Sequence, residues 1–188
     1  MAKTNLTKLC ESALWKENAK MGVFGCFEVS IGWEGREIVD FITYKTNNEF
    51  RCYEIKVSKA DYHSKANVSF VGDYNYYVMP TELYKELRKD ARKQVEDNDR
   101  LSEKEKDNLY DTRLKNLGIG LFVVSPNGLL TNKVSAKRKN ISHGEKSTLL
   151  ESMVRSLNRE VKKFYKIDPY WGSEVFPQEQ LELISEVQ

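Results

Sequence analysis

The most reactive-looking short stretch of this chain is RCYEIKV, in which Glu54 and Lys56 stand two residues apart. The run is typical of a β-strand, and side chains alternate across a strand, so both residues point to the same face. A carboxylate can hold a hard divalent cation, and a neighbouring ammonium group can offset charge on a phosphate. The same pattern is also common as an exposed charge pair on the wet face of a sheet. A second acid nearby would favour the chemical interpretation.

Asp40, in the preceding strand-like run REIVDFITY, can supply that second acid. We expect the two runs to form a hairpin that pairs Tyr44 with Phe50. That register places Asp40 opposite Glu54, with Cβ atoms about 4.5–5.5 Å apart, whereas a slip of one residue would move Asp40 out of line. Two facing carboxylates repel and need a positive partner. Lys56 is one such partner and a bound Mg²⁺ is another, so the three residues predict metal-assisted phosphodiester hydrolysis.

The elements that would position these residues follow from the hydrophobic pattern. The third strand is followed at once by a capping box, Ser58 with Asp61, which starts a short helix. This helix makes a right-handed crossover, so the third and fourth strands are expected to be parallel in a mixed sheet with helices on both sides, an α/β fold. The expected order is a helix at 5–19, strands at 23–31, 36–44 and 50–57, the short helix, a strand at 74–79, strands at 118–124 and from 129, and a helix at 145–165.

Two segments outside this core have distinct patterns. Residues 81–116 hold 20 charged residues among 36, ten of each sign, and predict one or two exposed helices inserted into the fold. The helix at 145–165 carries an apolar face, and we expect that face to be buried. Its members are Leu150, Met153, Val154, Leu157, Val161 and Phe164.

Composition sets the broad class of the protein. With 40% hydrophobic and 31% charged residues in 188, the chain is typical of a soluble globular protein. No apolar stretch approaches the ~20 residues that span a bilayer, and the N-terminus lacks the apolar core of a secretory signal, so we expect a cytoplasmic protein without a membrane partner. The widely spaced Cys10, Cys26 and Cys52 predict free core thiols rather than disulfides or a zinc site.

Charge divides the chain unevenly. We expect a single domain over 1–167 and an acidic tail over 168–188, which has five acids and no base. Since the whole chain carries +2, the domain carries about seven excess positive charges. Such a balance suits a polyanionic partner such as DNA, and it equally suits a solubilising surface.

Asp40, the run Glu54-Ile55-Lys56 and the following Ser58-Lys59-Ala60-Asp61-Tyr62 together resemble the PD-(D/E)XK nuclease superfamily. More narrowly, the segment is similar to small uncharacterised bacterial and phage proteins, and to DNA-repair-type proteins, with an EIKxSxxDF-like motif. The resemblance covers roughly 5–80. It implies a restriction-endonuclease-like α-β-β-β-α-β core, into which 81–116 would be inserted.

The resemblance also implies roles for individual residues. Asp40 and Glu54 would bind Mg²⁺ with the main-chain carbonyl of Ile55, and Lys56 would assist catalysis; Mn²⁺ is an expected substitute. The family often adds a glutamate from the first helix. Glu11 fits that role best, ahead of Glu28 and Glu17.

The sequence therefore predicts a Mg²⁺-dependent deoxyribonuclease, with a role in DNA repair, recombination or phage DNA processing. A homodimer would suit cutting of both strands, although the sequence reveals no seam for it. Two alternatives remain open: a catalytically inactive nucleic-acid-binding module of the same fold, and a protein-interaction domain that uses the charged insertion. The residues expected to contact the DNA backbone are Lys59, Lys65, Lys137, Arg138, Lys139, Arg155 and Arg159.

Overall fold

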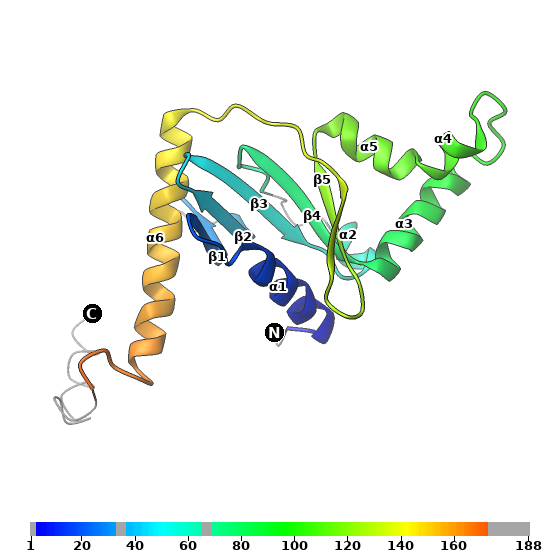
Figure 1. Cartoon of the computed structure of the whole chain (residues 1–188). Coiled ribbons are helices and arrows are strands. Elements are labelled where there is room, and N and C mark those ends of the chain that lie inside the picture. Colours follow the sequence, from blue (N-terminus) through cyan, green and yellow to red (C-terminus); the bar gives the residue numbers. More distant parts are fainter. Residues whose placement is uncertain (1–2, 33–36, 65–68, 173–188) are drawn as a thin grey trace.

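The computed structural model describes residues 3–32, 37–64 and 69–172 of the chain. These residues form a mixed α/β fold in which helices flank one six-stranded sheet (Figure 1). The strands are β1 (Val23–Ile31), β2 (Glu37–Lys45), β3 (Glu49–Ile55), β4 (Tyr74–Pro80), β5 (Gly120–Val124) and β6 (Leu130–Val134). The helices are α1 (Asn5–Asn18), α2 (Lys59–Tyr62), α3 (Thr81–Lys93), α4 (Glu103–Asp107), α5 (Leu109–Leu117) and α6 (His143–Tyr165).

The sheet follows the chain order, β1 to β6, without crossing strands. β1, β2 and β3 form an antiparallel meander, β3, β4 and β5 are parallel, and β6 returns antiparallel to β5. The predicted element order and the parallel pairing of the third and fourth strands are both confirmed. The predicted hairpin register is also confirmed, because Tyr44 pairs with Phe50.

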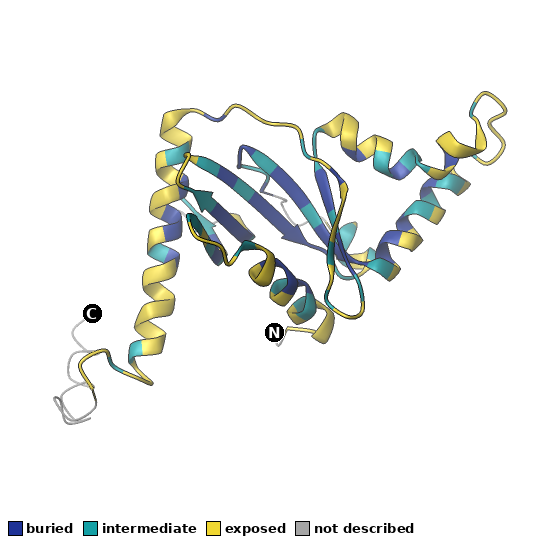
Figure 2. Cartoon of the chain, in the orientation of Figure 1, coloured by how far each residue is buried: buried dark blue, intermediate teal, exposed yellow. Residues whose placement is uncertain are grey.

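The two faces of the sheet are covered by different helices (Figures 1 and 2). α1 packs Cys10, Ala13 and Leu14 against one face, where the aromatic side chains of the middle strands gather. On the other face, α6 covers the β1 end and the insertion α3–α5 packs near β4 and β5. The side chain of Cys52 points to this second face, since it packs in one cluster with Leu149 and Met153 of α6.

The insertion holds three described helices rather than the one or two predicted. Ser102 opens α4 with a capping box, and Asn108 separates α4 from α5. The helices are not simply exposed, because Leu83, Leu87 and Leu114 are buried in a cluster with the sheet. Some charged residues of the insertion also pair with each other, as Arg92 does with Glu103 and Asp107. A charge count could not reveal this internal pairing.

The prediction for the last helix was wrong about which face is buried. Of the six apolar residues named, only Met153 is buried, and it packs beside Leu149. Ser152 and Ser156 are buried as well, and their small side chains let α6 lie close to β1. The remaining members are exposed: Leu150 (42%), Val154 (57%), Leu157 (39%), Val161 (42%) and Phe164 (57%).

Cys10, Cys26 and Cys52 are free and buried, as predicted. Burial raises the pKa of the Cys10 and Cys52 thiols to about 12 and that of Cys26 to about 11, so these thiols are weakly reactive. Among the described helices, none combines the length and the apolar character needed to cross a bilayer. Most of the predicted acidic tail lies outside the described residues.

Candidate functional site

Asp40 and Glu54 lie opposite each other just beyond the end of the β2–β3 ladder. The described ladder between these strands ends at the pair Phe41 and Tyr53, and Asp40 and Glu54 are the next residues in the same register. The side chain of Asp40 turns to the end of β3, where its Oδ2 accepts a hydrogen bond of 2.7 Å from the backbone N–H of Ile55. At this end of β3, the Asp40 carboxylate therefore takes the place of a backbone carbonyl as the acceptor for the Ile55 N–H.

Glu54 lies in an environment that disfavours its charge. Its side chain is buried, with 4% of the residue exposed, and its Oε1 has no hydrogen-bond partner among the described residues. Burial raises the pKa of Glu54 to about 8, and the negative charge of Asp40 adds to the rise, while Lys56 opposes it. The pKa of Asp40 is raised too, first by burial, against the N–H of Ile55. The raised pKa values show that the positive charge of Lys56 does not offset the burial of two neighbouring carboxylates.

Lys56 completes this group. The residue is only 6% exposed, and its ammonium nitrogen lies 3.5 Å from Oδ1 of Asp61. Its backbone N–H donates to the carbonyl of Val78 at 2.9 Å, which extends the contact with β4 beyond the end of β3. Both the backbone and the ammonium group of Lys56 are therefore held in place beside the carboxylates.

Asp61 is a further residue of the candidate site, and its sequence context indicated only the start of a helix. The predicted cap is confirmed for Ser58, whose side chain accepts from the Asp61 N–H. The reciprocal half of the capping box was wrong, because the Asp61 carboxylate accepts from the N–H of Val57, at 3.1 Å, and contacts Lys56. The Ser-x-x-Asp spacing was the available signal, since it brings Asp61 back over the end of β3.

Glu11 does not join Asp40 and Glu54 in one cluster. Lys3 bridges Glu11 and Glu28, with its ammonium nitrogen 2.6 Å from an oxygen of each. Among the residues that the structure describes, no three His, Cys, Asp or Glu side chains form a metal-binding group. Glu11 lies near enough that its charge contributes to the raised pKa of Asp40. The remaining candidate, Glu17, pairs with Lys20.

Several cations predicted to contact DNA have partners in the protein. Lys59 pairs with Asp90 of α3, and Arg138 lies 3.9 Å from the buried Asp73. Lys139 is exposed and donates to the carbonyl of Phe70, and Lys137 is exposed on the same strand-to-helix connection. Lys65 lies outside the described residues.

The two arginines of α6 hold that helix on β1. Arg155 donates to the carbonyl of Gly32 at 2.8 Å, and Arg159 donates to the carbonyl of Glu28 at 3.1 Å. These bonds connect α6 to the edge strand of the sheet, where the buried Ser152 hydroxyl also accepts from the Gly32 N–H. Both arginines therefore have structural roles in addition to any contact with phosphate.

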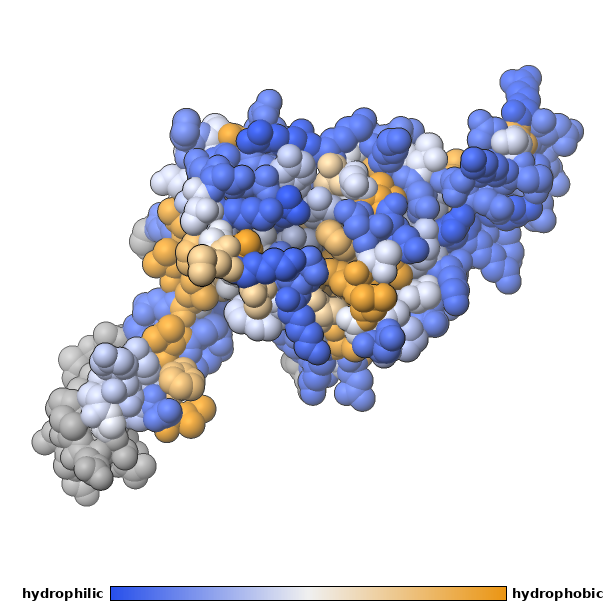
Figure 3. All heavy atoms as spheres, viewed as in Figure 1, coloured by the Kyte–Doolittle hydropathy of each residue, from blue (hydrophilic) through white to orange (hydrophobic). Residues whose placement is uncertain are grey.

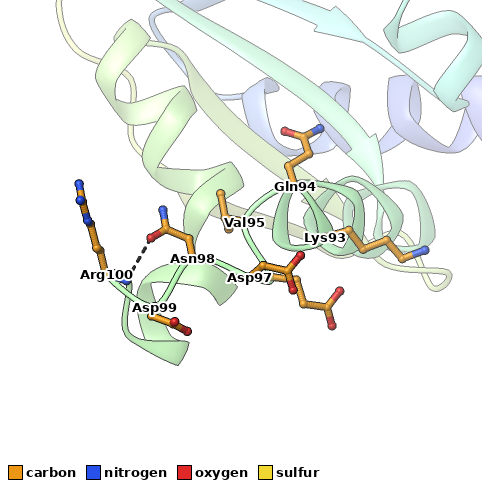
Figure 4. A pocket seen from close by; sticks show the side chains of 8 residues that line it. Lys93, Gln94, Val95, Asp97, Asn98, Asp99 and Arg100 are labelled. Atoms are coloured by element: carbon orange, nitrogen blue, oxygen red, sulfur yellow. Dashed lines mark hydrogen bonds between the residues drawn. The ribbon is translucent and has the colours of Figure 1, made fainter.

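A wide hollow elsewhere on the molecule lies apart from the carboxylates. It is formed by the loop that joins α3 to α4, residues 93–100, at the far end of the insertion from the middle of the sheet (Figures 1 and 4). Its lining side chains are mostly polar or charged, and they spread outward from one short segment. The hollow therefore follows from the shape of one loop and contains none of the candidate site residues.

No known family model matches the chain, and no curated protein is significantly similar to it. Among solved structures, the SPO1766 protein of unknown function from Silicibacter pomeroyi has a similar fold, with a TM-score of 0.60. The two sequences are 13% identical, and the match covers 89% of this chain and 95% of that chain. At this identity the likeness establishes that the fold is shared, with the sheet and helices described above.

Proposed function

We propose that this protein is a Mg²⁺-dependent nuclease that hydrolyses phosphodiester bonds in DNA, built on a restriction-endonuclease-like core. The observation that carries the proposal is the meeting of Asp40 and Glu54 at the end of a hairpin, with Lys56 buried beside them. The order α-β-β-β-α-β across α1 to β4, with β3 and β4 parallel, supports the same core.

The donor set fits a hard divalent cation. Among the described residues, Oε1 of Glu54 is buried without a hydrogen-bond partner, and Oδ2 of Asp40 accepts from the Ile55 N–H. Mg²⁺ commonly binds proteins through one or two carboxylates and fills its other positions with water and substrate phosphate oxygens. Asp40, Glu54 and the main-chain carbonyl of Ile55 would hold it, and Mn²⁺ would substitute because it favours the same oxygen ligands.

The proposed roles of the metal ion, Lys56 and Asp61 follow from these positions. Bound Mg²⁺ would polarise a phosphate oxygen and lower the pKa of a coordinated water. Lys56 supplies a fixed positive charge beside the carboxylates, where it can orient the attacking water or offset charge that develops on the phosphate. Asp61 acts as a positioning residue, because it contacts the Lys56 ammonium and the Val57 N–H.

DNA is the proposed substrate for two reasons. Residues 1–167 carry an excess of positive charge, and a water activated by a divalent cation can attack a phosphodiester. The exposed Lys137 and Lys139 are the proposed backbone contacts, and such contacts give binding that weakens steeply with salt. DNA repair, recombination and phage DNA processing are the proposed settings, from the resemblance of the Glu54-Ile55-Lys56 region.

The test is cleavage of circular, linear and single-stranded DNA with Mg²⁺, comparing the wild type with Lys56→Ala and Glu54→Gln. Removing either charged group is expected to lower the cleavage rate by about 100-fold or more. Circular dichroism and salt-dependent DNA binding are measured on the same samples. Binding without cleavage by the wild type would identify an inactive module, and equal cleavage by all three proteins would exclude this site as the source.

A further inference from the structure

α6 presents a continuous apolar stripe to solvent (Figure 3). The side chains form a line along the helix and are 39–57% exposed, although α6 already packs its Leu149 and Met153 face on the sheet. The stripe therefore lies beside the buried face and not within it. Its members are Leu150, Val154, Leu157, Val161 and Phe164.

The spacing of the stripe is that of a coiled coil. Successive members are separated by four, three, four and three residues, which is a heptad repeat. In that repeat Val154 and Val161 occupy the a positions, and Leu150, Leu157 and Phe164 occupy the d positions. Valine at a with leucine at d favours two strands in parallel coiled coils. The pattern indicates that the occupant is one other helix with a matching seam.

We propose that the occupant is α6 of a second copy of this chain, in a parallel, in-register pair. A two-fold axis requires a self-complementary surface, and a helix with the same residues at a and d on both sides provides one. This inference goes beyond the proposed function and does not depend on it, because Asp40, Glu54 and Lys56 lie outside α6.

The exposed area is consistent with a dimer contact. From their exposed fractions, the five side chains present roughly 400 Å² per copy, which is within the range of the largest apolar patch on a typical monomer, a patch that is often functional. Two copies together bury about 800 Å² from the stripe alone. The flanking side chains bring the interface toward the ~1,200 Å² at which specific, stable contacts begin.

Charge distinguishes a second copy from an anionic surface such as a membrane or DNA. The residues that flank the stripe at e and g include Glu151 and Glu160, and these acids pair with basic residues of the same helix. Because these acids offset the nearby basic residues, the flanks of the stripe carry no excess positive charge that would attract phosphate headgroups. In the parallel pair, Glu160 lies toward Tyr165 of the partner subunit, so the two copies of Glu160 do not face each other.

The test starts with the oligomeric state of the full chain in solution, by sedimentation at micromolar concentration. We expect the wild type to be a dimer and the double variant Val154→Glu/Leu157→Glu to be a monomer with an unchanged far-ultraviolet circular dichroism spectrum. The matched control, Lys162→Glu, changes an exposed residue of α6 that lies outside the stripe and its flanking e and g positions, and it is expected to stay dimeric. A monomeric wild type, or a dimer that survives the double variant, would overturn the proposal.

A single cysteine tests the pairing directly. The three native thiols are buried, so Val154→Cys introduces an accessible thiol that would face its own copy across the seam. Mild oxidation is expected to link Val154→Cys into covalent dimers and to leave Lys162→Cys monomeric on a denaturing gel. A dimer that does not cross-link through position 154 would overturn the parallel pairing. A wild-type monomer that dimerises only after removal of 173–188 would assign the stripe to the tail and overturn the proposal.

Discussion

The backbone N–H of Ile55 donates a 2.7 Å hydrogen bond to Oδ2 of Asp40, across the point where β2 and β3 separate. Asp40 therefore has a structural duty in addition to its proposed metal-binding role. Asp40→Ala leaves the Ile55 N–H without this acceptor and is expected to lower the free energy of unfolding by about 1–2 kcal/mol.

Asp40→Asn separates the two duties, because an amide oxygen still accepts from Ile55 while the charge is lost. We expect its stability, measured by urea denaturation, to stay close to that of the wild type, while its Mg²⁺ binding is weakened. If Asn and Ala destabilise the protein equally, the hydrogen bond is not what the side chain contributes.

The pKa of Glu54 predicts how stability depends on pH. Its value of about 8 in the folded protein exceeds the ordinary value near 4.5, so the folded state keeps a proton that the unfolded chain releases. The resulting stabilisation is fully present below the unfolded pKa and is lost as pH rises through 8. Without divalent cations, the wild type should lose on the order of 2–4 kcal/mol of stability relative to Glu54→Gln between pH 5 and 9. Parallel stability profiles for the two proteins would contradict the assignment.

Asp61 is predicted to act through Lys56. Asp61→Ala removes acceptors from the Val57 N–H and the Lys56 ammonium and is expected to cost about 1–2 kcal/mol of stability. Asp61→Asn keeps an oxygen for Val57 but removes the charge beside Lys56, so it should retain more stability and still lower the cleavage rate. A purely structural role would instead leave the rate of Asp61→Asn unchanged.

Gly120 is predicted to be essential for the close packing of β4 and β5. A Cβ atom at this position would overlap the ring of Tyr76 and approach the backbone nitrogen of Ala136 to 2.8 Å. Gly120→Ala should therefore destabilise the protein by about 1–3 kcal/mol. The matched control is Gly144→Ala in the first turn of α6, where the nearest atom is 3.9 Å away, and it should be neutral or slightly stabilising in thermal unfolding.

Local signals in the sequence were enough to predict how β2 pairs with β3 and where α2 begins. Alternation and turn length gave the register of Tyr44 with Phe50, and hence the meeting of Asp40 and Glu54. The Ser58 cap was equally local. These features depend on neighbours within one hairpin or one turn, where few arrangements compete.

Features that depend on distant neighbours were not predictable in this way. Helical spacing grouped Val154 with Met153, but only the position of β1 decides which of two adjacent faces of α6 is buried. Lys59 was expected to meet phosphate, and its pairing with Asp90 depends on how the insertion folds back over α2. Glu11 was matched to a family position, and its bond to Lys3 comes from the segment before α1.

The central claim is that Asp40 and Glu54 form a cation site, and calorimetric titration with Mg²⁺ near pH 7 tests it most directly. Titrations in two buffers of different ionisation enthalpy also count the protons released on binding. We predict that the wild type binds Mg²⁺ and releases close to one proton, because Glu54 must give up its proton to bind metal. Asp40→Asn and Glu54→Gln should bind at least about 10-fold more weakly. Absence of Mg²⁺ binding by the folded wild type, or equal binding by all three proteins, would contradict the claim.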